Sequence, residues 1–165
     1  MRHRTRSRYL AIGTISEGTL RPEDLIPAYL DALRPVRLSR THRREFRLID
    51  AAYRKFAGRD DDRDAEQYWE SDAPEDLDDL YTMADDYCPP YCHVGSTDGD
   101  GALIGVWPSV ESAREDTDEV VQGIQPRWPE DGRRYWLSIN DHGNATLYAR
   151  IGRTWARYRA IWSVV

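Results

Sequence analysis

The chain has 165 residues, of which 40% are hydrophobic, and a formal net charge of −6, which favours one ordinary folded domain. Its two cysteines exclude a disulfide-based fold, and no apolar run approaches the roughly 20 residues of a membrane span. The charged start lacks the apolar stretch of a signal peptide. We therefore expect a soluble, cytoplasmic protein.

Charge is divided along the chain rather than spread evenly. Residues 1–60 hold 14 basic and 7 acidic side chains, whereas residues 61–130 hold 3 basic and 20 acidic ones. Two interpretations stay open. Either the basic ends fold back on the acidic middle and neutralise it, or the acidic segment forms an exposed negative face that meets a basic partner.

The first part of the chain predicts a short arm followed by two helices. Residues 1–8 carry arginine at alternate positions, which is typical of a disordered arm and also of arms that contact nucleic-acid phosphates. TLRPEDLIPAYLDALRPVR (residues 19–37) has an apolar face at helical spacing. THRREFRLIDAAYRKFAG (residues 41–58) is a basic amphipathic helix, with Thr41 as the expected cap and Gly58 as the expected stop.

The acidic middle of the chain predicts further helix. DAEQYWE (residues 64–70) is expected to form a short helix, and SDAPEDLDDLYTMADDYCPP (residues 71–90) a longer one that begins near Ser71 or Asp72 and ends at the proline pair. The outer flank of the longer helix carries most of the carboxylates.

Beyond residue 90 the apolar pattern changes from helical to alternating. YCHVG and ALIGVW predict two strands joined by the hairpin loop STDGDG, residues 91–107 in all. PSVESAREDTDEVVQGI (residues 108–124) predicts a helix capped by Ser109. Residues 133–165 predict a three-stranded meander with turns at NDHGN and IGRT. The expected class is α+β, with residues 9–165 as a single domain in which amino-terminal helices pack on one face of an antiparallel sheet ending in this meander.

Metal and catalytic chemistry find little support in the sequence. Cys88, Cys92 and His93, with His142 as a fourth ligand, could bind zinc, but zinc sites favour cysteine pairs that occur twice. TDGDG lacks the glycine and the glutamate of a calcium loop where that loop needs them. There is no phosphate loop and no dinucleotide fingerprint, so we expect no metal, no cofactor and no catalytic residue.

Three stretches carry a resemblance to a known group of proteins. They are TLRPEDLIPAYLDAL, YCPPYCHVGSTDGDGALIGVWPS and INDHGNATLY…IWSVV. The Gly-Asp-Gly loop, the Trp-Pro and the NDHGN–TLY hairpin resemble, in this order, a group of small uncharacterised proteins of phages and other mobile elements. The group has no established activity. The resemblance implies an accessory gene that acts on a host complex, and anti-CRISPR and antirestriction inhibitors are one form of such genes.

We expect a non-enzymatic interaction protein that uses an acidic surface to bind a basic, nucleic-acid-handling host protein. Direct nucleic-acid binding through the arginine-rich arm and the basic helix is the weaker alternative, and no membrane contact is expected. The expected contact residues are Glu75, Asp76, Asp78, Asp79, Asp85, Asp86, Glu115, Asp116, Asp118 and Glu119.

A different class of function stays open as the second hypothesis. The chain would then be a small enzyme or ligand-binding protein with a pocket near the two hairpins, in which a concave site brings polar groups together. The lining residues would be Tyr91, His93, Asp98, Asp100, Trp107 and His142.

Overall fold

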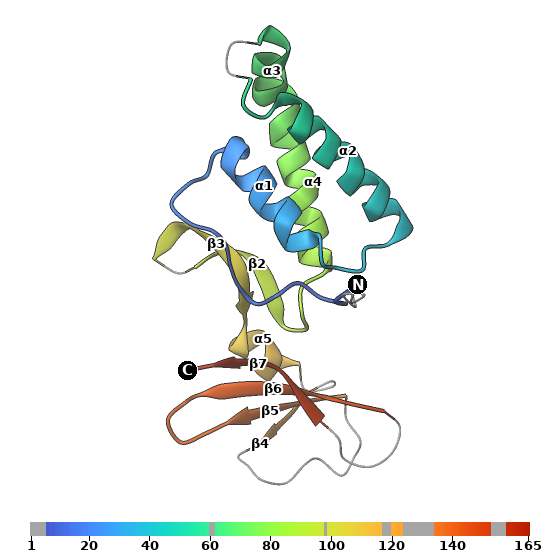
Figure 1. The fold of residues 1–165 in the computed structure, drawn as a ribbon. Coiled ribbons are helices and arrows are strands. Elements are labelled where there is room, and N and C mark those ends of the chain that lie inside the picture. The colour runs from blue at the N-terminus through green and yellow to red at the C-terminus, as the bar shows by residue number, and fades with distance from the viewer. Residues whose placement is uncertain (1–5, 60–61, 98, 117–119, 124–133, 153–157) are drawn as a thin grey trace, which may run out of the picture. The chain divides into compact units, whose positions relative to one another are not determined.

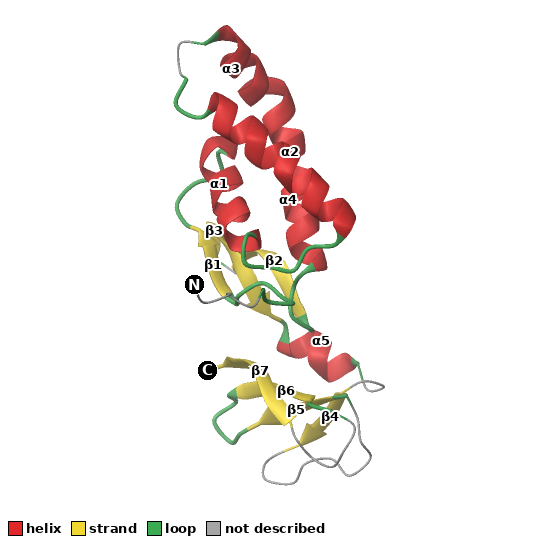
Figure 2. Cartoon of the chain, turned by 45° about the vertical axis from the view of Figure 1, so that its right-hand side comes forward, coloured by secondary structure: helices red, strands yellow, loops and turns green. Residues whose placement is uncertain are grey.

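A computed structural model describes residues 6–59, 62–97, 99–116, 120–123, 134–152 and 158–165. It confirms the predicted α+β class (Figures 1 and 2). The chain forms two compact units: unit 1 holds Met1–Cys88 and Val94–Trp107, and unit 2 holds Pro89–His93 and Pro108–Val165. The described strands are divided between two sheets instead of continuing in one.

Three helices supply most of the core of unit 1. They are α1 (Pro22–Leu33), α2 (Arg40–Phe56) and α4 (Ala73–Asp86), and α4 packs against both of the others. Their apolar faces follow the predicted helical spacing, and the buried side chains include Ile26, Leu30, Leu33, Ile49, Leu80 and Met83. None of the described helices combines the length and the apolar character that crossing a bilayer requires.

The cap of α2 lies two residues before the predicted one. Ser39, not Thr41, is the cap, and its Oγ accepts a hydrogen bond from the amide of His42 at 3.1 Å. A cap must lie just before the helix and reach an amide of its first turn; Thr41 is already helical. Gly58 follows the end of α2 with a φ of 72°, the left-handed conformation predicted for a stop.

The start of α4 agrees with the prediction in position, with Asp72 at the N-cap, but not in its hydrogen bonding. The expected short helix is present as α3 (Arg63–Gln67), and it continues through a π-helical turn, η1 (Tyr68–Asp72), directly into α4. Asp72 makes no capping hydrogen bond, and the Ser71 hydroxyl donates to the carbonyl of Gln67 instead. Because the backbone is helical across this junction, the first amides of α4 have carbonyl partners and need no separate cap.

Helices α2 and α4 are antiparallel and are joined at both ends. Near the start of α2, the hydroxyl of Tyr87 accepts from the amide of Ser39 at 2.6 Å and lies 3.1 Å from Nδ1 of His42. Near its end, Phe56 stacks on Tyr68 with 4.7 Å between ring centroids. The negative end of α4 thus lies beside the positive end of α2, which is favourable for both helix dipoles.

The sheet of unit 1 has the order β1-β3-β2 among the described residues. Its strands are β1 (Gly13–Ser16), β2 (Cys92–Thr97) and β3 (Asp100–Pro108). The predicted hairpin is present as β2 and β3, with Gly99 in the turn at a φ of 88°. Strand β1, which pairs antiparallel with β3, was not predicted.

Unit 2 contains α5 (Val110–Glu115) and a sheet in the order β4-β5-β6-β7. The strands are β4 (Val120–Gly123), β5 (Tyr135–Ile139), β6 (Ala145–Arg150) and β7 (Tyr158–Val164). The antiparallel meander is confirmed in β5, β6 and β7. The helix predicted to residue 124 is wrong at residues 120–123, which pair in parallel with β5, and α5 ends at Glu115; residues 117–119 and 124 lie outside the described residues. Ser109 caps α5 as predicted.

A row of buried side chains crosses the meander and forms the core of unit 2. Leu137, Leu147 and Trp162 lie opposite one another on adjacent strands, and all three are buried. The indole nitrogen of Trp162 donates to the carbonyl of Pro90 at 2.9 Å. The last strand is therefore attached to the segment between the two cysteines.

The predicted amino-terminal arm is described from residue 6 onward. Within it, the amide of Ser7 donates to the carbonyl of Pro35 at 2.9 Å, and the amide of Arg37 donates to the carbonyl of Ser7 at 2.7 Å. Residues 6–8 are thereby attached to the segment before α2, and residues 1–5 lie outside the described residues. The single domain proposed for residues 9–165 stays a prediction.

We predict that Gly105→Ala destabilises unit 1 by about 1–3 kcal/mol, the usual cost of overpacking. A Cβ atom at Gly105 would lie 2.5 Å from the carbonyl oxygen of Gly13 and 2.5 Å from the ring of Trp107. Since one of these atoms belongs to the backbone of β1, the strand itself would have to move. Urea unfolding measures the effect, and Gly101→Ala on the same strand is the control, because its Cβ would meet open space. Equal stability of the two variants would contradict this account.

Candidate functional site

The acidic flank predicted from the sequence is an exposed face of α4. Glu75, Asp78, Asp85 and Asp86 are exposed and Asp79 is half-buried; we call these five residues the α4 acidic face. They lie opposite the buried face of the helix because the apolar and acidic positions alternate with a helical period. At 1.5 Å per residue the acidic face is about 16 Å long.

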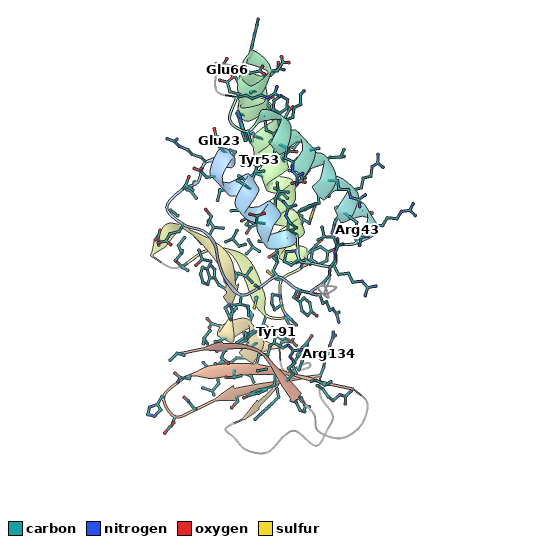
Figure 3. The ribbon with its side chains drawn as sticks, in the orientation of Figure 1. Glu23, Arg43, Tyr53, Glu66, Tyr91 and Arg134 are labelled. Carbon is teal, nitrogen blue, oxygen red and sulfur yellow. The ribbon has the colours of Figure 1, made fainter. Side chains whose placement is uncertain are left out.

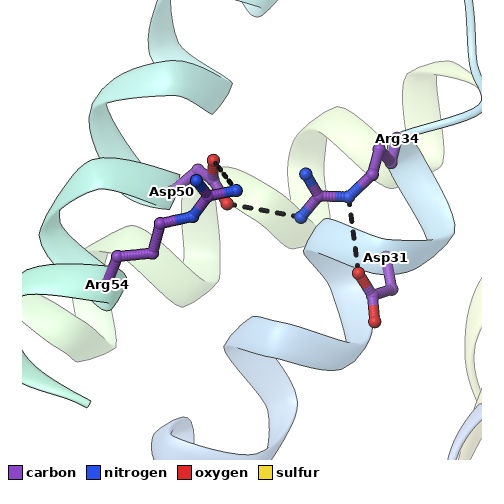
Figure 4. Close-up of polar contacts among 4 residues, drawn as sticks. All are labelled: Asp31, Arg34, Asp50 and Arg54. Carbon is purple, nitrogen blue, oxygen red and sulfur yellow. Dashed lines mark hydrogen bonds and ion pairs between the residues drawn. The ribbon is translucent and has the colours of Figure 1, made fainter.

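The described arginines of unit 1 pair with carboxylates outside this face or with none. Figure 4 shows that Arg34 and Arg54 both reach Asp50, at 3.3 and 3.0 Å, and that Arg34 also contacts Asp31. Among the described residues, no arginine or lysine forms an ion pair with a carboxylate of α4. Within the described part of the chain, Asp86 lies 3.7 Å from Nε2 of His42, and Asp85 accepts a 3.4 Å hydrogen bond from the amide of Val94. The interpretation in which basic segments cover the acidic middle therefore receives little support in unit 1.

Asp76 does not belong to the α4 acidic face, although the sequence groups it with the others. Its carboxylate accepts a hydrogen bond of 2.7 Å from the hydroxyl of Tyr68 and is only half-exposed. Burial raises the pKa of Asp76, and the neighbouring Asp79, Asp72 and Glu75 raise it further, while the bond from Tyr68 opposes the change. Burial and the bond to Asp76 likewise raise the pKa of Tyr68. Asp76 joins η1 to α4 and is a structural residue.

An apolar groove of about 260 Å³ runs beside the α4 acidic face. It is open to solvent between α1, α4 and β3, and Asp78 belongs both to the groove and to the acidic face. On its wall, the hydroxyl of Tyr81 donates to the carbonyl of Val94 at 2.9 Å, which fixes a ring that is 41% exposed. The lining residues are Leu25, Tyr29, Pro74, Leu77, Asp78, Tyr81 and Ile104.

Sequence patterns could not have found this groove. Its lining comes from three elements far apart in the chain, and each apolar residue of α1 and α4 is equally well explained as part of the core. The one available signal is Tyr81, an aromatic residue that lies at the border between the apolar stripe and the acidic flank of its helix.

The second predicted acidic cluster belongs to unit 2. Glu115 is exposed at the end of α5, whereas Asp116 is half-buried and accepts a 2.8 Å hydrogen bond from the hydroxyl of Tyr91. Asp118 and Glu119 lie outside the described residues. The contact role of Glu115, Asp118 and Glu119 stays a prediction, and Asp116 has a structural bond that the sequence did not indicate.

The residues of the alternative pocket are distributed over both units. In unit 1, Asp100 bonds to the amide of Ala102 and Trp107 donates to the carbonyl of Gly95 at 2.9 Å. Both side chains therefore have local structural partners, and Asp98 lies outside the described residues.

The remaining members of the alternative pocket belong to unit 2. Tyr91 packs edge-on against Tyr135, with 5.7 Å between centroids. His93 is exposed, and His142 is exposed at the tip of the NDHGN turn, where Asn140 accepts from two amides of the turn. A shared pocket for these residues stays a prediction.

The cysteine segment ends α4 and begins β2, as predicted for a turn. Burial raises the pKa of the Cys88 thiol to about 12, with a smaller contribution from Asp85, so this thiol is a poor nucleophile at neutral pH. Cys88 belongs to unit 1, whereas Cys92 and His93 belong to unit 2. Within the described part of the chain, no three His, Cys, Asp or Glu side chains are grouped as a metal ion would need.

We predict that Asp76→Asn makes unit 1 more stable than the wild type at pH 7. The raised pKa means that the folded protein binds the Asp76 proton more tightly than the unfolded chain, so wild-type stability falls as pH rises through that pKa. Asparagine keeps an oxygen for Tyr68 and carries no charge. Urea unfolding between pH 4 and pH 7 should show that the free energy of unfolding of the variant exceeds that of the wild type by an amount that grows with pH. Asp79→Asn is the control for charge removal alone, and the same pH profile in both variants would refute this role for Asp76.

Comparison with known proteins supplies no relative from which a role could be transferred. No protein-family model, curated protein or solved structure matches this chain. The resemblance to small proteins of phages and mobile elements stays a prediction.

Proposed function

We propose that this chain is a non-enzymatic interaction protein that binds a basic, nucleic-acid-handling protein through the α4 acidic face and the groove beside it. The observation that carries the proposal is the position of Asp78, which is exposed on the acidic face and also lines an apolar groove. Protein contacts derive much of their affinity from buried apolar anchors surrounded by a polar rim. This surface offers both parts.

The chemistry of the surface defines the segment it would accept. An apolar side chain of the partner would enter the groove between Leu25, Leu77 and Ile104, and flanking lysine or arginine residues would meet Asp78 and Glu75. Glu75, Asp78 and Asp79 lie within about one turn of each other, and Asp85 and Asp86 follow about two turns later, so a segment with two similarly spaced groups of basic residues would match them. Proteins that handle nucleic acids carry such basic rows.

The resemblance to phage and mobile-element proteins extends the proposal to a biological setting. In that setting the chain would act in the host cytoplasm, and an acidic surface that occupies a phosphate-binding site could inhibit a defence complex of the CRISPR or restriction type. The α4 carboxylates, which have no arginine or lysine partner among the described residues, support this form of the proposal, because a phosphate-binding site attracts negative charge.

We predict that Glu75→Arg combined with Asp78→Arg weakens partner binding by about tenfold or more. Each exposed ion pair contributes roughly 0.2–1 kcal/mol to binding, and reversal of the charge replaces this attraction by repulsion. A loss of about 1.4 kcal/mol of binding free energy raises the dissociation constant tenfold. The partner would be captured with the tagged full-length protein from a nuclease-treated lysate of a host bacterium, then purified and titrated at several salt concentrations. Binding should also become less sensitive to salt.

The matched control is Glu66→Arg combined with Glu70→Arg, which reverses the same number of exposed charges on α3 and η1. Glu66 is labelled on α3 in Figure 3, and neither Glu66 nor Glu70 lines the groove. Equal weakening by both double variants would attribute the effect to net charge and would reject the α4 surface. Partner binding unchanged by Glu75→Arg and Asp78→Arg would reject the proposal itself.

A further inference from the structure

We propose that the outer face of α2 binds the phosphate backbone of duplex DNA, a second contact separate from the proposed protein contact. The face is defined by Arg40, Arg44, Arg47, Arg54 and Lys55, all of them exposed, and we call it the α2 basic face. The five positions share one side of the helix because their spacing follows its period. At 1.5 Å per residue they extend over about 22 Å.

Most of these charges have no counter-charge in the part of the chain that the structure describes. Arg40, Arg44 and Arg47 form no ion pair with any carboxylate of the described residues, and the ammonium of Lys55 lies over the ring of Phe56 at 4.4 Å. Arg54 differs, because it shares Asp50 with Arg34. Such charges gather counterions from solution. A polyanion that replaces those ions gains free energy from their release.

The amino-terminal arm extends the basic face beyond the helix. Ser7 pairs with Val36, and the exposed Arg6 and Arg8 flank Ser7 on either side. The exposed Arg37 follows Val36 and donates its amide to the carbonyl of Ser7. The arm is therefore attached beside the start of α2. The positive end of that helix favours anions, and its first turn contains no acidic residue.

The inner side of α2 argues against a membrane as the occupant. Amphipathic helices bind membranes by inserting an apolar face, but Phe46 and Ile49 are buried in the core of unit 1. Within the described residues of α2, Leu48 is the one large apolar side chain that is exposed. Figure 3 shows long side chains that project from α2 on the side away from α1 and α4.

The composition of the basic face also argues against single-stranded nucleic acid. Proteins that bind single strands stack the bases on aromatic side chains. The aromatic residues of α2 do not belong to the exposed face: Tyr53 meets Trp69, and Phe56 stacks on Tyr68. Guanidinium groups without stacking partners suit the continuous phosphate rows of a duplex, which they can contact without reading its sequence.

The acidic α4 does not block this surface. The α2 basic face and the α4 acidic face each lie opposite the buried side of their own helix, so both point away from the shared core. Among the described contacts, the two charged helices approach each other at His42 and Asp86, 3.7 Å apart, near the start of α2. The middle and the end of the basic face, from Arg44 to Lys55, have no such neighbour.

The test is fluorescence anisotropy of a labelled 20-base-pair DNA duplex with the full-length protein between 50 and 200 mM salt. We expect saturable binding. The logarithm of the association constant should fall linearly with the logarithm of the salt concentration, with a slope of about −0.9 for each phosphate contacted. Arg44→Ala combined with Arg47→Ala should weaken binding about tenfold or more at 50 mM salt and reduce the slope by about 2. Arg150→Ala combined with Arg159→Ala removes the same charge from exposed positions of unit 2 and should have little effect.

Four results would overturn the proposal. The first is the absence of saturable duplex binding at 50 mM salt, and the second is equal weakening of duplex binding by the control variant. The third is tighter binding of the matching single strand or of phosphatidylserine vesicles than of the duplex. The fourth is self-association of the protein that is lost both in the α2 charge variant and in the α4 charge variant. The last result would assign the face to a second copy of the chain. Glu75→Arg combined with Asp78→Arg should leave duplex binding intact or strengthen it, so failure of the protein contact and failure of the DNA contact can be told apart.

Discussion

The arrangement of unit 1 depends on the antiparallel packing of α2 against α4. Tyr87 joins the start of α2 to the end of α4, and the stacked rings of Phe56 and Tyr68 join the other ends. Each helix has one apolar face, and this packing buries both. Most arginines of α2 and most carboxylates of α4 are then directed toward solvent, except Arg43, which donates to the carbonyl of Leu38, and Asp76, which bonds to Tyr68. A division of charge along the sequence becomes a division of charge between two surfaces.

Apolar packing can hold these helices together despite the repulsion within each of them. Like charges three or four residues apart, such as Arg40 with Arg44 or Glu75 with Asp79, destabilise a helix by roughly 0.2–0.5 kcal/mol per pair. Complete burial of a side chain such as Leu80 or Met83 stabilises the fold by roughly 1.5–3 kcal/mol. A few buried side chains therefore offset the repulsion on either helix. The charged faces are tolerated by the fold and are not required by it, which favours a functional reason for their presence.

Helices and hairpins were predictable where the signal is local. The apolar spacing of α1, α2 and α4 located them, and the same spacing placed Glu75 and Asp78 on an outer flank. Strands β1 and β4 could not be found in this way, because each is only four residues long and is defined by a distant partner strand. The helix predicted through residue 124 failed for the same reason.

The candidate site shows the same limit at the level of single residues. Asp76 has the same residue type as its neighbours and lies on the same helix, yet it differs from them because Tyr68 lies eight residues earlier across a π-helical turn. The spacing of residues in the sequence does not predict that π-helical turn. The groove likewise depends on Ile104 of β3 meeting α1 and α4, a contact between segments far apart in the chain. The acidic face was therefore predictable, and the apolar part of the surface was not.

Two charged surfaces on one rigid core would act independently rather than allosterically. Coupling between sites requires an element with two arrangements that both ligands bias, and α2 and α4 are joined by a short hydrogen bond at one end and by stacked rings at the other. Direct electrostatic coupling is also weak. Packed helix axes are roughly 8–10 Å apart, the outer faces are farther apart than that, and exposed charges are screened over about 8 Å at physiological salt. A basic protein on α4 and a DNA duplex on α2 would therefore bind with nearly additive free energies, and unit 1 could hold both at once.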